Sequence, residues 1–243
     1  MAEFFLIQKI IAYLAEGDNA WLKMERQGRI HARYNPNGTV TGRSTHSAPN
    51  IAQVPGVKKE KGKGILYGLE GGYGYECRSL FGPPEGWSML GADMSGLELR
   101  CLAHYMAKYD GGDYVKAVTE GDVHTTNMVA AGIESRDQAK RFIYAYLYGA
   151  QAKKISMVLE CKESRARKVM DDFNKGLPAL ASLKQAVAMH AKTGFIPAID
   201  GRKIPIRSPH AALNSLLQST GSVLCKAWLI AIRNDLQAQG LRW

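Results

Sequence analysis

Cysteine is scarce in this sequence, and the cysteines present match no known site pattern. The four are Cys77, Cys101, Cys161 and Cys225. They form no CxxC pair, and no histidine stands at the spacing of a zinc site. This pattern excludes a structural zinc centre of the usual spacing, and we predict buried thiols in a reducing compartment.

Long apolar runs without charge are also missing. No run approaches the roughly 20 residues that a membrane-spanning helix needs, so we predict no membrane partner. The apolar start of the chain carries Glu3 and Lys9. It lacks the basic segment and the small-residue cleavage site of a signal peptide. We therefore predict a helix there.

Acidic residues are too few to balance the basic ones. The 243 residues include 22 Asp and Glu against 32 Lys and Arg, a formal net charge of +10. This excess favours a polyanionic partner, because neutralising phosphates releases condensed counterions. Charge alone leaves open a basic protein with no nucleic-acid role. Hydrophobic and charged contents of 46% and 22% are those of an ordinary globular protein.

The periodicity of apolar residues predicts a mostly helical α/β chain. Strands are expected over residues 29–34 and, buried, over 87–93, with a hairpin over 195–206 around Asp200-Gly201. Two stretches, 35–55 and 58–74, are predicted loops. The second is basic, and a solvated surface loop is favoured there over a DNA contact. Helices are expected over 3–15, 97–108, 112–119, 123–131, 136–148, 151–160, 163–174, 178–190 and 209–239, the last bent near Gly221.

A carboxylate stands where the predicted strand 87–93 ends. Asp93 is followed by Ser95 and Gly96 before the next helix opens. At a sheet edge such a carboxylate can share Mg²⁺ with phosphate oxygens, because this hard cation prefers oxygen ligands. Asp is also a common helix N-cap. This block alone favours neither interpretation.

Charged and aromatic side chains form one stripe on the predicted helix 136–148. Ser135 and Gln138 make the capping box that begins this helix. At about 100° per residue, a step of four residues drifts by only about 40°. Such a stripe can place cations on a triphosphate and ring faces on a base, although an amphipathic surface helix with incidental tyrosines is the alternative. The stripe consists of Arg136, Lys140, Tyr144 and Tyr148.

The two blocks together resemble those of family A DNA polymerases, closest to the replicative enzymes of T-seven-type phages. The family's Asp-x-Ser-x-x-Glu-Leu-Arg block is matched from Asp93 to Arg100. Its fingers helix, Arg-x-x-x-Lys-x-x-x-Phe/Tyr-Gly-x-x-Tyr-Gly, is matched from Arg136 to Gly149, with Ala145 at the usual glycine position. The Asp-x-His block of the family is matched by Asp122 and His124.

The resemblance implies a role for each matched residue. Asp93, helped by the Met94 carbonyl, binds two catalytic Mg²⁺ ions. Glu98 crowds the sugar 2′ position and so excludes ribonucleotides. Tyr144 packs on the sugar and base of a deoxynucleoside triphosphate, and Tyr148 stacks near the template. The implied triphosphate contacts are Arg136, Lys140 and His124.

Two further blocks resemble the family's contacts with the primer–template duplex. The loop from Thr41 to Pro55 places Arg43 over the minor groove, with Asn50 and Gln53 near the primer. In the last helix, polar side chains repeat every four residues and suit the minor-groove acceptors N3 and O2, which occur on every base pair. Without the resemblance, a solvated polar face is favoured. The repeating residues are His210, Asn214 and Gln218.

The resemblance implies a right-hand polymerase: a palm sheet fragment with an inserted helical fingers subdomain. The expected parts are the end of the thumb at 1–28, palm at 29–105, fingers at 106–207 and an incomplete second part of the palm at 208–243. No His-Asp-Glu triplet, the family's second metal carboxylate, occurs in the sequence. The exonuclease domain and nearly all of the thumb, with any processivity-factor site, are also unmatched.

The expected function is therefore DNA-directed DNA polymerase activity from an incomplete polymerase domain in the cytoplasm of a bacterial host. The alternative is an inert fragment that binds DNA and nucleotide and needs a complementary polymerase chain. A related single-subunit RNA polymerase is disfavoured by Glu98 as a sugar gate.

Overall fold

The computed structural model describes residues 1–206 and 208–241, with the side chain of His210 left out. The chain forms two compact units. One comprises Met1–Thr39 with Ser44–Asp93, and the other comprises Val40–Arg43 with Met94 onward. The subdomain ranges expected from the sequence stay a prediction, and each unit is described by itself.

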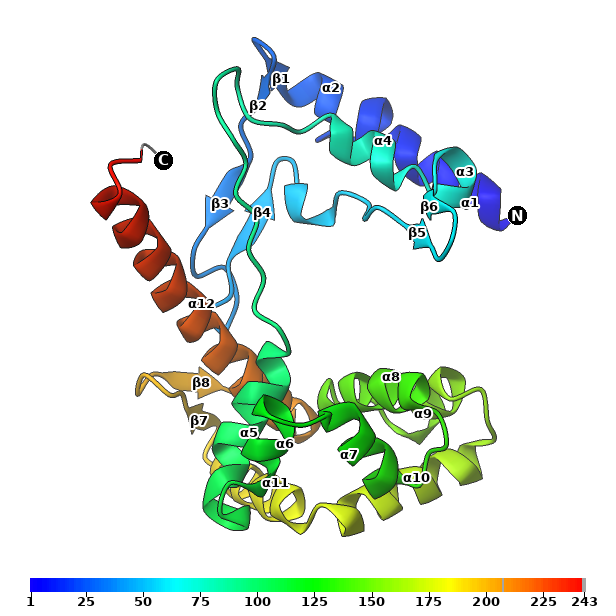
Figure 1. Ribbon diagram of the computed structural model, residues 1–243, viewed down its shortest axis with the longest axis vertical. Helices are drawn as coiled ribbons and strands as arrows, with labels where there is room; N and C mark the ends of the chain where they lie inside the picture. The colour runs from blue at the N-terminus through cyan, green and yellow to red at the C-terminus, as the bar shows by residue number, and fades with distance from the viewer. Residues whose placement is uncertain (207, 242–243) are drawn as a thin grey trace. The chain divides into compact units, whose positions relative to one another are not determined.

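Short helices and three two-stranded antiparallel hairpins make up the first unit (Figure 1). Its small core gathers around Trp21, which stacks on Tyr13 and meets Phe81 edge to face. The helical elements are α1 (Ala2–Ile11), η1 (Ala12–Glu16), α2 (Trp21–Met24), η2 (Ile51–Gln53), α3 (Gly68–Gly71) and α4 (Gly74–Ser79). The strands are β1 (Glu25–Arg26), β2 (Arg29–Ile30), β3 (Arg33–Asn35), β4 (Thr45–Ser47), β5 (Lys59–Glu60) and β6 (Gly64–Ile65).

Four predictions for this unit are wrong. The loop expected over 35–55 contains the strand β4 and the short helix η2. The strand expected over 29–34 is divided between β2 and β3, which pair with different partners. The basic stretch 58–74, expected to be a loop, contains the β5–β6 hairpin and helix α3. The apolar run 87–93 is exposed and not a strand, with Leu90 69% exposed. A strand needs a neighbour for its backbone hydrogen bonds, and no strand in the described part of the chain pairs with this run.

The second unit is a helical cluster with one hairpin. Phe142 of α8 lies at its centre, edge to face with Phe173 of α10. Helix α8 packs between α7 and α9, and α10 covers both of those helices. The elements are α5 (Leu97–Asp110), α6 (Asp113–Thr119), α7 (Val123–Ala131), α8 (Arg136–Leu147), α9 (Ala152–Val158), α10 (Glu163–Gly176), α11 (Pro178–Ala191), β7 (Phe195–Pro197), β8 (Lys203–Pro205), η3 (Pro209–Ala211) and α12 (Ala212–Ala238).

Here the sequence predictions hold closely. Every expected helix occurs within a few residues of its expected bounds. The hairpin pairs Ile196 with Ile204 and turns at Asp200-Gly201. The Ser135 side chain caps α8 by accepting a hydrogen bond from the Gln138 N–H at 3.4 Å. The mostly helical α/β class is confirmed.

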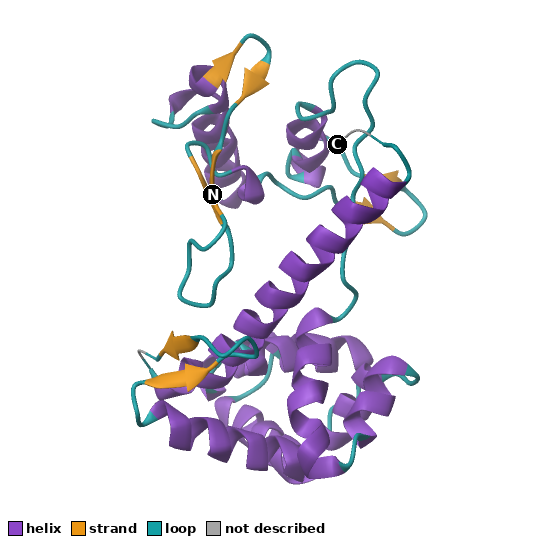
Figure 2. Ribbon diagram, turned by 90° about the vertical axis from the view of Figure 1, so that its left-hand side faces the viewer, coloured by secondary structure: helices purple, strands orange, loops and turns teal. Residues whose placement is uncertain are grey.

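Two expectations about α12 are corrected. Figure 2 shows the helix continuing without a break, so it is not bent at Gly221. Gly221 allows a close approach of α5, because an added Cβ would lie 3.2 Å from the Leu97 side chain, which is tighter than usual. By length and composition alone, α12 is also long and apolar enough to cross a membrane. A core helix passes the same test, and Leu216 and Leu217 of α12 are buried in the core of its unit.

The cysteine prediction holds in part. None of the four cysteines forms a disulfide; Cys77 and Cys101 are buried, Cys161 is half-buried, and Cys225 is exposed. Burial, with a smaller contribution from the charge of Glu98, raises the pKa of Cys101 to about 11. That thiol is therefore protonated and unreactive at neutral pH.

Candidate functional site

The predicted stripe forms on the outer side of α8. The other side of this helix is buried in the core through Ala139, Phe142, Ile143 and Leu147. On the stripe, Arg136, Lys140 and Tyr148 are exposed and Tyr144 is half-buried. A hollow of about 450 Å³ opens beside it, lined by Lys140, Arg141, Tyr144, Met157 and Val158. Cations and ring surface therefore share one accessible face.

At the C-terminal end of the stripe, Tyr148 meets Glu98. The Tyr148 hydroxyl donates a hydrogen bond to the Glu98 carboxylate at 3.2 Å, although 50 residues separate them. Burial and the charge of Glu98 raise the pKa of Tyr148, and the charge of Arg43 opposes that rise. Three predicted site residues thus lie in one neighbourhood. The bond restricts the Glu98 carboxylate to one direction.

The short segment that carries Arg43 is fixed against α12. The Gly42 carbonyl accepts hydrogen bonds from the Ser222 hydroxyl at 2.6 Å and the Lys226 ammonium at 2.8 Å. Gly42 has a φ of +77°, and an added Cβ would collide with the Arg202 guanidinium. The positive φ favours glycine here, because other residues rarely adopt this conformation. The predicted duplex contact Arg43 is therefore positioned by the same helix that carries Asn214 and Gln218.

At the opposite end of the stripe, Arg136 forms a two-pronged ion pair with Asp122. Its Nε and Nη2 atoms donate to the two Asp122 oxygens at 2.7 and 3.0 Å. Asp122 also accepts from the Thr125 hydroxyl and the His124 N–H. The hydrogen bond from Arg136 is the largest reason that the pKa of Asp122 lies well below its ordinary value. The pair orients the guanidinium beside the stripe, a partnership that sequence spacing did not reveal.

His124 carries an orphaned polar atom next to the stripe. Its ring centroid lies 6.4 Å from that of Tyr144. Its Nδ1 atom is buried and has no hydrogen-bond partner among the described residues. Burial, then the charges of Arg136 and Lys140, lower the pKa of His124. An unpaired buried nitrogen that senses the charges of two cations is a candidate contact for an anionic ligand, since such atoms are rarely left unsatisfied.

Asp93 is available as a metal ligand, and the helix-cap alternative is wrong. Helix α5 begins at Leu97, with Gly96 at the N-cap position in the left-handed region at φ 61°. Asp93 is exposed and forms no hydrogen bond with the described part of the chain. No group of three or more His, Cys, Asp or Glu side chains suited to a metal occurs among the described residues. The metal-binding role of Asp93 and of the Met94 carbonyl therefore stays a prediction.

The remaining predicted duplex contacts divide between the two units. Asn50 and Gln53 are exposed in the first unit, where the Asn50 side chain caps η2 by accepting from the Ala52 N–H at 3.2 Å. Asn214 and Gln218 are half-exposed on α12, and their amides bond to no described residue. The predicted contact by the His210 side chain lies outside the described residues.

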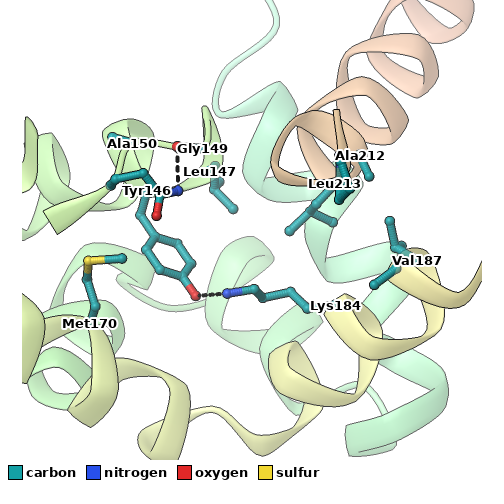
Figure 3. A pocket seen from close by; sticks show the side chains of 12 residues that line it. Tyr146, Leu147, Gly149, Ala150, Met170, Lys184, Val187, Ala212 and Leu213 are labelled. Atoms are coloured by element: carbon teal, nitrogen blue, oxygen red, sulfur yellow. Dashed lines mark hydrogen bonds between the residues drawn. The ribbon is translucent and has the colours of Figure 1, made fainter. Parts of the chain in front are cut away.

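A second hollow lies against α8, and the sequence did not predict it (Figure 3). Its volume is about 320 Å³. The Lys184 ammonium of α11 donates to the Tyr146 hydroxyl at 2.5 Å, and that hydroxyl donates to Asn174 at 2.6 Å. The ammonium also lies 4.7 Å from the centroid of the Tyr146 ring. Lys184 directly follows the buried Leu183 in α11. A lone cation beside an apolar helix face was therefore the one sequence feature that could have indicated this hollow.

Comparisons with known proteins agree with this geometry. The model of DNA polymerase family A matches residues 2–243. The chain belongs to DNA polymerase family A. The DNA-directed DNA polymerase of Escherichia phage T7 is 41% identical over 264 residues, covering 99% of this chain and 36% of the phage protein. DNA polymerase I of Chloroflexus aurantiacus is 27% identical over 235 residues, covering 89% of this chain and 24% of that protein.

A solved structure shares the fold. The POL domain of Pol1 from M. smegmatis, in complex with DNA primer-template and dNTP, matches with a TM-score of 0.72 at 23% identity. The match covers 93% of this chain and 41% of that one. This family A chain thus has the fold of a polymerase domain, and it spans about a third of the length of its phage T7 relative.

Proposed function

We propose that these 243 residues form the nucleotide- and duplex-binding part of a DNA-directed DNA polymerase. The reaction is transfer of a deoxynucleotide to the 3′ end of a primer under the direction of a template. The stripe on α8 carries the proposal, because it joins a cation end, next to the orphaned His124 nitrogen, to an aromatic end that contacts Glu98. The relatives' names, DNA-directed DNA polymerase and DNA polymerase I, support the same activity.

The cation end of the stripe binds the triphosphate. Arg136 has donors left beyond the two that Asp122 uses, because a guanidinium carries five N–H groups. The exposed Lys140 ammonium lies one helical turn further along. The His124 ring donates to a phosphate oxygen when Nδ1 carries the proton. These groups hold the leaving phosphates in place, which lowers the entropic barrier to the reaction.

The aromatic end selects the sugar and base. Tyr144 offers its ring face to the nucleotide, and the Glu98 carboxylate occupies the space of a 2′-hydroxyl. The bond from Tyr148 keeps Glu98 in this position. Arg43, Asn214 and Gln218, with Asn50 and Gln53 of the other unit, hydrogen-bond the duplex without reading its sequence.

Mg²⁺ is the proposed cofactor, with Asp93 and the Met94 carbonyl among its ligands. When bound, Mg²⁺ would stabilise the charge on the reacting and leaving oxygens. A two-metal site needs carboxylates on both sides, and the His-Asp-Glu triplet that the resemblance expects to supply the second one does not occur in this sequence. By itself, the 243-residue polypeptide is therefore expected to bind DNA without extending a primer. It extends primers together with a polypeptide that supplies the second carboxylate, in the cytoplasm of a bacterial host.

The titration of His124 tests this nucleotide site. Because burial and two nearby cations lower its pKa, His124 is neutral at pH 7 in the free protein. A bound triphosphate would offset the charge of those cations and accept a hydrogen bond from the protonated imidazole, so the pKa of His124 should rise on dNTP binding. Affinity for dNTP should accordingly increase as the pH falls through the pKa of the complex.

The measurement is an NMR titration of the histidine side chains with primer–template, with and without dNTP. His190 at the end of α11 serves as an internal control, since it lies outside the stripe. The matching nucleoside, which lacks phosphates, should leave the His124 pKa unchanged. An unchanged His124 pKa at saturating dNTP would contradict the proposed triphosphate site.

A further inference from the structure

The basic segment after η2 folds into a defined hairpin. Strands β5 and β6 pair Lys59 with Ile65 and Glu60 with Gly64. The Leu66 N–H donates to the Lys58 carbonyl at 3.0 Å and closes the open end. Gly62 has a φ of +90°, a conformation that other residues rarely adopt. The turn is therefore encoded locally, and we call residues 58–66 the lysine hairpin.

The lysine hairpin carries an excess of positive charge. Its four lysines, Lys58, Lys59, Lys61 and Lys63, are all exposed. Glu60 is its only acidic residue, and Lys63 engages it at 3.0 Å. The other three lysines form no ion pair with a described residue. Three cations thus face solvent within four consecutive positions.

The base of the hairpin is held in place by its own unit. A Cβ on Gly74 would overlap the Gly56 carbonyl, and one on Gly71 would overlap the Leu66 carbonyl, so the backbones meet closely on both sides. The Arg78 Nε atom donates to the Pro55 carbonyl at 3.1 Å. The hairpin therefore projects from an anchored base. Such anchoring reduces the conformational entropy that a ligand contact would cost.

Aromatic surface adjoins the hairpin along the chain. Tyr67, which follows β6 by two residues, packs edge to face on Tyr75 with ring centroids 4.9 Å apart. Their exposed fractions are 56% and 39%. Lysines for phosphates beside exposed rings for sugars or bases are the combination that nucleic-acid surfaces use. An acidic protein partner would need the cations but not the rings.

We propose that the lysine hairpin is a sequence-independent contact for the sugar–phosphate backbone of DNA. It lies a few residues beyond Asn50 and Gln53 in the same unit, so it would extend their primer-side contacts along the backbone. The inference rests on the proposed function, because it assumes that the chain holds a primer–template. It assigns a partner to a segment that the DNA-contact motifs do not include.

The test compares two variants with the same change in charge. The hairpin variant is K58Q/K59Q/K61Q, which keeps Lys63 paired with Glu60. The control is K162Q/K168Q/K175Q, on and beside α10, where these exposed lysines also lack ion pairs with described residues. Primer–template affinity is measured by fluorescence anisotropy over a range of salt concentrations. The logarithm of the binding constant falls linearly with the logarithm of the salt concentration, and each lost phosphate contact should reduce the steepness of that fall by about 0.9.

We expect the slope of the hairpin variant to fall by about two to three and its affinity to fall at least about tenfold near 0.1 M salt. The affinity and salt dependence of the control should change far less, and those of K58R/K59R/K61R should match the wild type. Equal behaviour of hairpin variant and control would overturn the inference and leave the proposed function standing. Wild-type protein that fails to bind primer–template at all would overturn both.

Discussion

Replacing Asp93 by asparagine should reduce primer extension by about a thousandfold. A metal ligand contributes several kcal/mol to stabilising the charge on the reacting oxygens, and about 1.4 kcal/mol corresponds to a tenfold rate change. Asparagine keeps the size and one oxygen of the side chain but removes its charge. Asp93 is exposed and its side chain forms no hydrogen bond with the described residues, so folding does not depend on the carboxylate.

The assay uses the chain joined to a segment that carries the His-Asp-Glu hairpin expected from the family resemblance, called the extended chain below. Primer–template affinity should stay within about twofold of the parent, because Asp93 is not among the proposed duplex contacts. Asp113→Asn in the first turn of α6 is the matched control and should extend normally. Extension at an unchanged rate by Asp93→Asn would show that this carboxylate binds no catalytic metal.

Replacing Glu98 by alanine should admit ribonucleotides, raising their use relative to deoxynucleotides on the order of a hundredfold. The carboxylate excludes the 2′-hydroxyl by occupying its space, and removing a blocking group removes the discrimination that it provides. The rate of deoxynucleotide incorporation should fall much less, because Glu98 is not among the proposed triphosphate contacts. The measurement is the ratio of ribonucleotide to deoxynucleotide incorporation in the same extended chain.

The Tyr148→Phe variant tests the hydrogen bond to Glu98 without removing the Glu98 carboxylate itself. This variant keeps Glu98 but removes the hydroxyl that donates to it at 3.2 Å. We expect a few-fold to about tenfold loss of sugar discrimination, because a hydrogen bond from a partly exposed hydroxyl contributes about 0.5–1.5 kcal/mol and about 1.4 kcal/mol corresponds to a tenfold change. If Glu98→Ala incorporates deoxynucleotides but rejects ribonucleotides as the parent does, Glu98 is not the sugar gate.

Local sequence was sufficient for the helical unit and its stripe. Arg136, Lys140, Tyr144 and Tyr148 repeat every four residues, and the helix period alone places them on one face. The hairpin at Asp200-Gly201 likewise depends on a turn whose residues are adjacent in the chain. Such features need no knowledge of distant partners, so the periodic pattern predicted them.

Features that depend on distant residues were missed. The run 87–93 has the composition of a buried strand, but a strand forms only where another strand supplies hydrogen bonds. The Asp122–Arg136 ion pair joins residues 14 apart, and the Lys184–Tyr146 contact joins residues 38 apart. Gly221 was interpreted as a bend, although its reason is the approach of Leu97 from another helix.

Template-directed choice of nucleotide by the extended chain tests the central claim most directly. Four primer–templates that differ only in the first unpaired template base are each incubated with one dNTP at a time and Mg²⁺. We predict that each template directs addition of its complementary deoxynucleotide and that the 243-residue chain alone binds all four without extending them. An extended chain that is folded and binds DNA, yet adds no nucleotide or adds one irrespective of the template, would contradict the account.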